Sequence, residues 1–208
     1  MIIERLVVGP FQTNCYVVGD AATLEGAVID PGGDSRHILD VIEHLGLHVQ
    51  LVINTHGHVD HIAANADVLQ ETGAQLAIHA DDAAMLTDPL RSLSVFLGKF
   101  RPSPAASKYL VDGQDVAIGQ TTLRVLHVPG HSPGGIGLWC AIDGAVFCGD
   151  TLFRLGIGRF DLPGGNGKVL LDSIRSKLLI LPDQTIVYPG HGPQTTIGFE
   201  RLNNPYLT

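Results

Sequence analysis

The sequence has few cysteines and none in a paired arrangement. Its 208 residues include only Cys15, Cys140 and Cys148, with no Cys-x-x-Cys spacing. An odd number of unpaired cysteines gives no sign of a disulfide framework, and a structural zinc site would normally need cysteines at short spacings. Cys140 and Cys148 lie in apolar, strand-like runs, so we interpret them as core residues.

Long apolar runs and basic residues are also scarce. No stretch approaches the roughly 20 apolar residues of a membrane span. The N-terminus enters a strand directly, without the features of a signal peptide, so we expect a cytoplasmic protein with no membrane partner. Lys and Arg number 13 against 21 Asp and Glu, a net charge of -8. This balance argues against a nucleic-acid partner, because such binding needs clustered basic residues.

The composition otherwise suits a folded protein, with 45% hydrophobic and 16% charged residues. Apolar runs bounded by turn residues predict strands over residues 2–8, 14–18, 26–29, 49–53, 75–78, 115–118, 122–127, 135–140, 145–148 and 185–188. The chain has two halves, each with strands followed by helices. This order predicts an α+β fold in which two sheets pack face to face and carry helices outside. No linker-rich boundary divides it, so we expect one domain over residues 1–208.

Four helices are predicted between these strands. Asp34 and Ser35 are expected to cap a helix that Gly46 ends, with apolar residues at a spacing near 3.6. The others are expected over residues 62–69, 80–86 and 168–181, with a helical turn near 199–202. Residues 88–107 form a long loop that either covers a site or is an ordinary excursion. His79, between the 75–78 strand and the 80–86 helix, is interpreted as structural.

The segment from His56 to His61 concentrates ligand-type side chains. His56-Gly57-His58-Val59-Asp60-His61 holds three imidazoles and a carboxylate in six positions, directly after a buried strand. Sites in α/β folds commonly lie where a strand ends and a helix begins. The alternative is a polar turn that happens to hold three histidines, and the rest of the chain argues against it.

Three further polar residues follow strands and each comes directly after a glycine: His131, Asp150 and His191. Glycine lets the backbone crowd close to a site, so these positions suit ligands at one rim. Asp30 also follows a strand. It is either a partner of a ligand histidine or an acceptor for backbone amides in its own turn.

Together these residues resemble the motifs of the metallo-β-lactamase superfamily, over nearly the whole chain. The resemblance implies an αββα sandwich, of two mixed sheets with helices on the outer faces, and a two-metal site at one edge. It implies that His56, His58 and His131 hold one metal, that Asp60, His61 and His191 hold the second, and that Asp150 bridges them.

Within this superfamily the chain is similar to glyoxalase II, the hydroxyacylglutathione hydrolases. The similarity covers residues 149–153 and 158–160, and it implies that Arg159 contacts the glutathione portion of a thioester, with Arg154 as a second candidate. The alternative is that Arg159 pairs with a nearby acid such as Asp161 and only shapes its loop. Fuller relatives continue into a C-terminal helical domain, but only 17 residues follow His191 here (208 minus 191). The chain therefore resembles the short form.

The expected activity is thioester hydrolysis of the S-lactoylglutathione type, by a metal-bound hydroxide held at Asp60 and Asp150. Two divalent ions are expected, zinc first, although imidazole and carboxylate ligands also suit iron and manganese. A bound water can reach a pKa of about 7, so no serine or cysteine nucleophile is needed. The alternatives are a persulfide dioxygenase with one iron, and a lactonase or other ester hydrolase of the same fold. The acyl group, the carrier thiol and the oligomeric state stay open.

Overall fold

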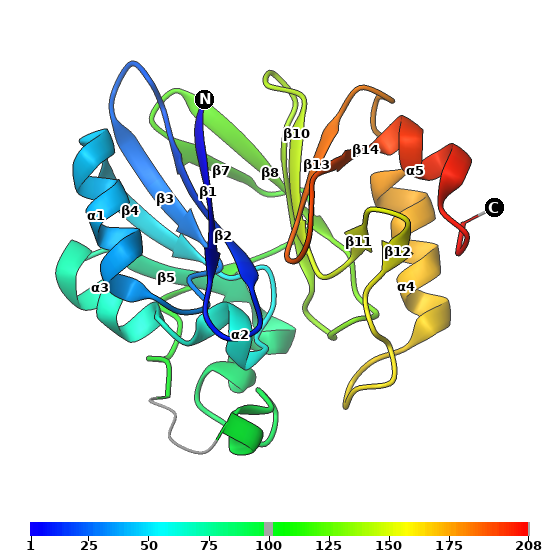
Figure 1. Cartoon of the computed structure of the whole chain (residues 1–208), viewed down its shortest axis with the longest axis horizontal. Helices are drawn as coiled ribbons and strands as arrows, with labels where there is room; N and C mark the ends of the chain where they lie inside the picture. The colour runs from blue at the N-terminus through cyan, green and yellow to red at the C-terminus, as the bar shows by residue number, and fades with distance from the viewer. Residues whose placement is uncertain (98–101, 208) are drawn as a thin grey trace.

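Two six-stranded β-sheets face each other in the computed structural model, which describes residues 1–97 and 102–207 (Figure 1). The first sheet has the order β1-β2-β3-β4-β5-β6, antiparallel from β1 to β3 and parallel from β3 to β6. Its strands are β1 (Ile2–Val8), β2 (Thr13–Gly19), β3 (Glu25–Ile29), β4 (His48–Ile53), β5 (Gln75–His79) and β6 (Lys108–Leu110). It therefore uses the first half of the chain, as predicted.

The second sheet comes from the other half. Its order is β14-β13-β10-β9-β8-β7, antiparallel except for the parallel pair of β10 and β13. The strands are β7 (Asp115–Ile118), β8 (Thr121–His127), β9 (Ile136–Cys140), β10 (Ala145–Gly149), β13 (Ile186–Pro189) and β14 (Thr195–Thr196). A separate hairpin is formed by β11 (Leu152–Phe153) and β12 (Gly156–Ile157).

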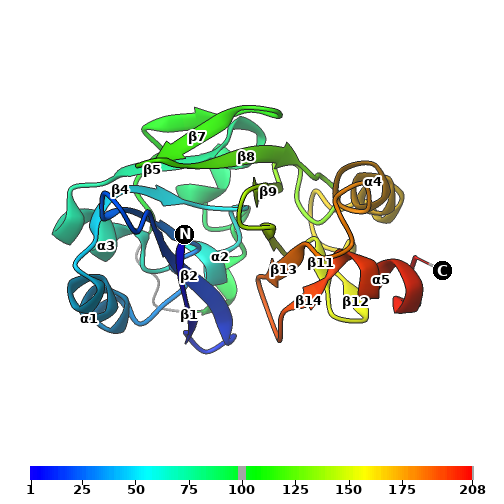
Figure 2. The same ribbon diagram turned by 90° about the horizontal axis from the view of Figure 1, so that it is seen from above.

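Alternating side chains bury both faces of each sheet. In β10, Ala145 and Phe147 belong to a core between the sheets, whereas Val146 and Cys148 belong to a core under the helices. A third core lies between the first sheet and its helices. Three apolar cores thus lie between four layers of secondary structure, in the order helix, sheet, sheet, helix. The helices α1 and α3 form one outer layer, and α4 and α5 form the other (Figure 2). The predicted αββα sandwich of two mixed sheets is confirmed.

The first helix, α1 (Ser35–Leu45), ends at Gly46 in a left-handed conformation with φ 66°, as predicted. The predicted capping role of Asp34 is wrong. A capping residue normally has extended backbone, but Asp34 has φ 48° and makes no capping hydrogen bond. Its carboxylate instead accepts a hydrogen bond from the backbone amide of Gly9, 2.9 Å away, and so joins the β1–β2 turn.

The helix predicted over residues 62–69 is two helices, α2 (Val59–Ile62) and α3 (Asn65–Thr72). The break occurs where the amide of Ala64 donates to the carbonyl of Pro31, 2.8 Å away. The predicted 80–86 helix is the 3-10 helix η1 (Ala80–Leu86), and the predicted 168–181 helix is α4 (Gly167–Ser173) followed by a π-helical turn, η3 (Ile174–Leu178). The tail forms α5 (Ile197–Asn203).

The long loop over residues 88–107 contains one 3-10 turn, η2 (Ser94–Leu97), and its residues 98–101 lie outside the described part. All three cysteines are buried and free, and Cys140 and Cys148 are confirmed as core residues. In the described ranges, no helix has the length and apolar character needed to cross a membrane.

Candidate metal centre

Seven histidine and aspartate side chains meet where strands of both sheets end. The structure brings together every residue that the sequence predicts as a metal ligand. They are His56 and His58 after β4, Asp60 and His61 on α2, His131 between β8 and β9, Asp150 after β10, and His191 after β13. The group therefore spans the junction of the two sheets.

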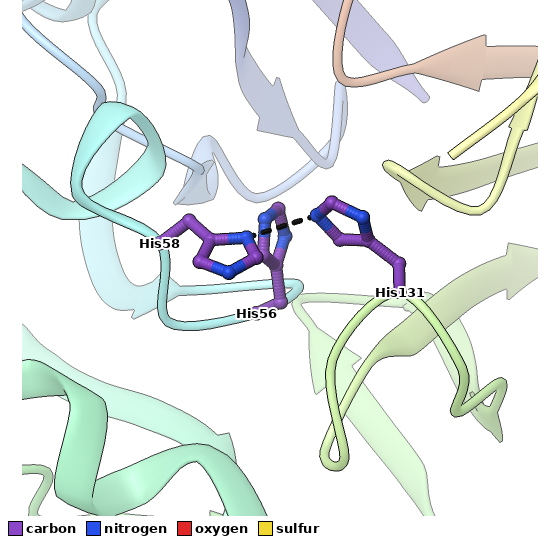
Figure 3. Close-up of side chains that lie close together, drawn as sticks. All are labelled: His56, His58 and His131. Carbon is purple, nitrogen blue, oxygen red and sulfur yellow. Dashed lines mark hydrogen bonds between the residues drawn. The ribbon is translucent and has the colours of Figure 1, made fainter. Parts of the chain in front are cut away.

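The three-histidine cluster consists of His56, His58 and His131 (Figure 3). Nδ1 of His58 lies 2.9 Å from Nε2 of His131. The three rings are nearly perpendicular, with interplanar angles of 79° to 84°. Nitrogen lone pairs lie in the ring plane, so perpendicular rings can direct them to one point.

The aspartate–histidine cluster consists of Asp60, His61 and His191. Oδ2 of Asp60 lies 3.1 Å from Nε2 of His191 and 3.5 Å from Nε2 of His61. This second set again offers imidazole nitrogens and a carboxylate oxygen to a common point.

Asp150 lies between the two clusters. Its Oδ2 is 3.6 Å from Nε2 of His131 and 3.6 Å from Nε2 of His191, and its Oδ1 is 3.4 Å from Nε2 of His61. The close approach depends on glycine, since a Cβ atom on Gly190 would lie 2.1 Å from Oδ1 of Asp150. The predicted role of glycine beside a ligand is confirmed here.

The protonation states of several of these histidines and aspartates suit the binding of a cation. Burial holds the pKa of His56 well below its usual value and lowers that of His58 to about 3, so both rings are neutral at pH 7. Burial opposes the charge of Asp60 and Asp150, but the neighbouring histidines, led by His61, outweigh it and lower both pKa values. His56 and His58 thus offer neutral imidazoles, and Asp60 and Asp150 offer ionised carboxylates, which are the protonation states that metal ligands need.

The surroundings of His61 also favour a positive charge. Burial acts to lower its pKa, but the carboxylates of Asp60, Asp150 and Asp30 outweigh burial and raise the pKa well above its usual value. A metal ion would supply this charge in place of the proton.

Several buried polar atoms of the site have no hydrogen-bond partner among the described residues. They are Nε2 of His56, His58 and His61, and Oδ1 of Asp150. Leaving a buried polar atom unpaired costs free energy, so native structures rarely do so without a ligand. Nitrogen and oxygen donors without a thiolate suit zinc, iron or manganese. The residues therefore fit divalent metal ions.

Of the two roles that the sequence left open, Asp30 takes the first, as the partner of a ligand histidine, and the backbone amide that it binds lies in the turn after β4 rather than in its own turn. Its Oδ2 lies 3.0 Å from Nδ1 of His61 and accepts a hydrogen bond from the Thr55 hydroxyl at 2.6 Å. Its Oδ1 accepts from the Thr55 amide at 2.7 Å. A carboxylate on the far nitrogen of a ligand histidine fixes the orientation of the ring.

Two residues that hold the ligand loops were not predicted. Asn14 binds the segment of His191, because its amide donates to the carbonyl of Gly190 at 2.7 Å and its side chain donates to Pro189 and Gly192. Asp82 is fully buried between the loops of His56 and His131. Burial raises the pKa of its carboxyl group. The partners of both residues are distant in the sequence, and no local pattern marks them.

Ser132 lies in a Gly-x-Ser-x-Gly pattern, residues 130–134, that can mark a nucleophilic serine. Its side chain is buried, and its hydroxyl donates to Oδ2 of Asp82 at 2.7 Å. Activation of a serine needs a neighbouring base that leaves the hydroxyl exposed to substrate, so this geometry does not suit a nucleophile.

A cavity of about 690 Å³ opens onto both clusters. The ligands His58, Asp60, His131, Asp150 and His191 line one end. The apolar part of its wall is formed by Phe11, Val59, Leu93, Phe153, Ile157, Leu162 and Pro163. Leu93 comes from the loop over residues 88–107, so this part of the loop contributes to covering the site.

The two arginines proposed as substrate contacts lie in different places. Arg159 lines the cavity, where its guanidinium pairs in a bidentate manner with Asp161 at 2.9 and 3.0 Å. Its backbone carbonyl accepts a hydrogen bond from Nδ1 of His131 at 2.7 Å. The structure does not bring Arg154 to the cavity wall. Its guanidinium lies over the ring of Phe199, 5.4 Å from the centroid.

The β11–β12 hairpin, which supplies Phe153 and Ile157 to the cavity, is anchored on α5. The buried carboxylate of Glu200 accepts a hydrogen bond from the amide of Leu155 at 2.9 Å. The side chain of Asn204 donates to the carbonyl of Gly156 at 3.0 Å. The C-terminal helix thus helps to hold one wall of the cavity, together with the second sheet, on which Leu152 packs.

His79, Asp81 and His127 form a further group of ligand-type residues outside the cavity. The rings of His79 and His127 are stacked at 4.1 Å with an interplanar angle of 8°. Because the two rings are parallel, their nitrogen lone pairs lie in two separate parallel planes and do not point to one ion. This arrangement agrees with the structural interpretation of His79.

The family model of the metallo-beta-lactamase superfamily matches residues 8–191. Hydroxyacylglutathione hydrolase GloC of Haemophilus influenzae is 36% identical, with 100% of this chain and 98% of that protein covered. The crystal structure of BLEG-1 B3 metallo-beta-lactamase is 37% identical with a TM-score of 0.94, and covers 100% of both chains. The structure of TTHA1623 in a di-iron-bound form is 34% identical with a TM-score of 0.89, over 98% of this chain and 100% of that one.

Proposed function

Because the chain belongs to the metallo-beta-lactamase superfamily, whose members bind divalent metals, we propose that it hydrolyses a thioester of the S-lactoylglutathione type. The observation that supports this most is the pairing of the seven-ligand site with an apolar cavity that has a guanidinium, Arg159, on its wall. An acyl chain suits the apolar wall, and a carboxylate on the carrier thiol suits Arg159. A full-length relative named as a hydroxyacylglutathione hydrolase adds support.

The ligand assignment is part of this proposal. The three-histidine cluster would hold one ion, the aspartate–histidine cluster the second, and Asp150 would bridge them. Zinc is the expected metal. Iron and manganese suit the same donors, and the di-iron form of a 34% identical protein supports iron as the first alternative.

When bound, the metals supply a water with a pKa lowered toward neutrality and positive charge for the carbonyl oxygen of the substrate. Asp60 and Asp150 are ionised at pH 7 and would orient the attacking water by accepting its hydrogen bonds. Asp30 keeps the ring of His61 in place, and the carbonyl of Arg159 does the same for His131. The apolar wall holds the acyl chain and limits access of bulk water.

We propose that residues 1–208 act as one domain on a small-molecule substrate, with no nucleic-acid or membrane partner. The acidic balance of the chain supports the exclusion of nucleic acid.

The test is a comparison of substrates with the purified chain loaded with zinc, iron or manganese. Release of free thiol from S-lactoylglutathione, without uptake of dioxygen, is expected. A lactone, a cephalosporin and glutathione persulfide are assayed beside it, with His131→Ala as the inactive control. Oxygen consumption with the persulfide, one iron per chain and no thioester hydrolysis would replace the proposal with the dioxygenase alternative.

A further inference from the structure

Asp82 is a carboxylate on η1 with 0% exposure that lies between the two loops of the three-histidine cluster. Its Oδ2 accepts hydrogen bonds from the Gly57 amide at 3.1 Å and from the Ser132 hydroxyl at 2.7 Å. Its Oδ1 accepts from the Gly134 amide at 2.6 Å. All three donors belong to the loops that carry the histidines.

The positions of these donors relate Asp82 to the ligands. Gly57 lies between His56 and His58 in the turn after β4, which belongs to the first sheet. Ser132 directly follows His131 in the β8–β9 connection of the second sheet. The carboxylate of Asp82 therefore links ligand loops from two different sheets. Its position helps to set the distance between His131 on one loop and His56 and His58 on the other.

Contact between Asp82 and the second loop is close. A Cβ atom on Gly134 would lie 2.6 Å from the backbone nitrogen of Asp82, so only glycine permits the present approach. Among the described residues, the rings of His58 and His131 contact each other directly, and one backbone hydrogen bond joins the same loops, from the amide of Ile136 to the carbonyl of Thr55 at 2.8 Å. That bond lies on the far side of His56 and does not touch the turn between His56 and His58.

The aspartate–histidine cluster is held by other residues. Asp30 contacts His61, and Asn14 binds the backbone on both sides of His191. None of the hydrogen bonds of Asp82 described above reaches this cluster. Asp30 also reaches the three-histidine cluster through Thr55, whose hydroxyl lies 3.2 Å from Nδ1 of His56. The hydrogen bonds of Asp82, in contrast, reach the three-histidine cluster alone, so a change at Asp82 is expected to affect that cluster.

We propose that Asp82 is a positioning residue that sets the placement of His131 relative to His56 and His58, and thereby the metal affinity of the three-histidine cluster alone. The inference rests on the ligand assignment of the proposed function. Losing a partner that orients metal ligands typically lowers metal affinity about 10- to 100-fold.

Asp82→Asn is the conservative variant. An amide has one acceptor oxygen, so its nitrogen must face either the Gly134 amide or the Gly57 amide, and two donors then oppose each other. The shape of the side chain is kept, and the loss is one of hydrogen bonding.

The experiment measures zinc affinity in two backgrounds that each retain one cluster. The demetallated full chain carrying His191→Ala keeps the three-histidine cluster, and the chain carrying His131→Ala keeps the aspartate–histidine cluster. Each is titrated with zinc against a chelator of known affinity, with and without Asp82→Asn. The variant is expected to weaken binding about 10- to 100-fold in the His191→Ala background. In the His131→Ala background the change is expected to stay within about twofold.

Asp20→Asn is the matched control. Asp20 is likewise a buried carboxylate that joins two turns, accepting from the amides of Ala22 and Thr23 in one and of Gln120 in the other. It is expected to lower stability without changing zinc affinity in either background. Gly134→Ala is a second variant, whose added Cβ atom would crowd Asp82 from the loop of His131. It should likewise weaken zinc binding in the His191→Ala background and leave the His131→Ala background unchanged.

Equal weakening in both backgrounds, or none in the His191→Ala background, overturns the positioning role. If neither background binds zinc, the ligand assignment is wrong as well. No substrate enters this measurement, so a failure to hydrolyse thioesters bears only on the proposed function.

Discussion

Arg159→Ala is expected to raise KM for an anionic thioester by about tenfold while leaving kcat nearly unchanged. Two opposing effects set this size. A hydrogen bond between charged partners changes an equilibrium by roughly ten- to a hundredfold. Arg159 is paired with Asp161 in the free protein, and exposed ion pairs typically change an equilibrium by less than about fivefold. The substrate contact should therefore prevail over this pair, with a net effect near tenfold.

The structure also explains why kcat should be preserved. Arg159 supports His131 through its backbone carbonyl, which alanine retains. The guanidinium lies on the cavity wall and would contact the carrier end of the substrate in ground and transition states alike. Loss of such uniform binding appears in KM.

The assay compares S-lactoylglutathione with the lactoyl thioester of N-acetylcysteamine, which carries no carboxylate. Arg159→Ala should affect only the first. Asp161→Ala, which frees the guanidinium, should lower KM for the anionic substrate by up to about fivefold. Lys168→Ala is the control, because Lys168 is an exposed cation paired with Asp172 and does not line the cavity. An equal loss on both substrates, or a fall confined to kcat, would refute the binding role.

Three further predictions concern the site and the fold. Asp150→Ala should abolish the binding of two ions per chain together with turnover, measured by metal analysis and thioester hydrolysis, and a variant that keeps both refutes the bridging assignment. Backbone hydrogen bonds, first that from Thr23, lower the pKa of Asp20 in the folded protein. The ionised carboxylate therefore stabilises the fold above its unfolded pKa of about 3.9, and this contribution is lost as the pH falls through the lower folded pKa. The Tm of Asp20→Asn should thus lie below that of the unsubstituted protein at pH 7, and the gap should narrow in thermal denaturation below about pH 4. Phe147 is fully buried between the sheets and stacks on Tyr188 at 5.0 Å, so Phe147→Ala should reduce the free energy of unfolding by about 3–5 kcal/mol in urea titrations.

The clustering of the seven candidate ligands was predictable from the sequence because their signals are local. His56 to His61 hold four ligand-type side chains in six positions, and His131, Asp150 and His191 each follow an apolar strand and a glycine. The ten predicted strands were likewise found from local signals, since an apolar run bounded by turn residues, such as that of β10, depends on neighbouring residues alone. These features do not require knowledge of which segments meet.

The supports of the site could not be predicted in this way. Asp82 acts on Gly57 and Gly134, which are 25 and 52 positions away, and Asn14 acts on Pro189, 175 positions away. Asp34 shows the converse error, because a local capping pattern was overridden by a left-handed backbone that turns its carboxylate to Gly9. Hydrogen bonds between distant segments depend on tertiary packing, which a single sequence does not display.

The anchoring of the β11–β12 hairpin on α5 has an evolutionary consequence. The ligand side chains sit on the ends of the large sheets, whereas Phe153 and Ile157 sit on a small hairpin held by Glu200 and Asn204. Mutations in the hairpin or in α5 can therefore reshape the pocket while the reactive centre stays intact. Substitutions in α5, which lies behind the hairpin, therefore offer a route by which substrate preference can change while the candidate ligands are kept.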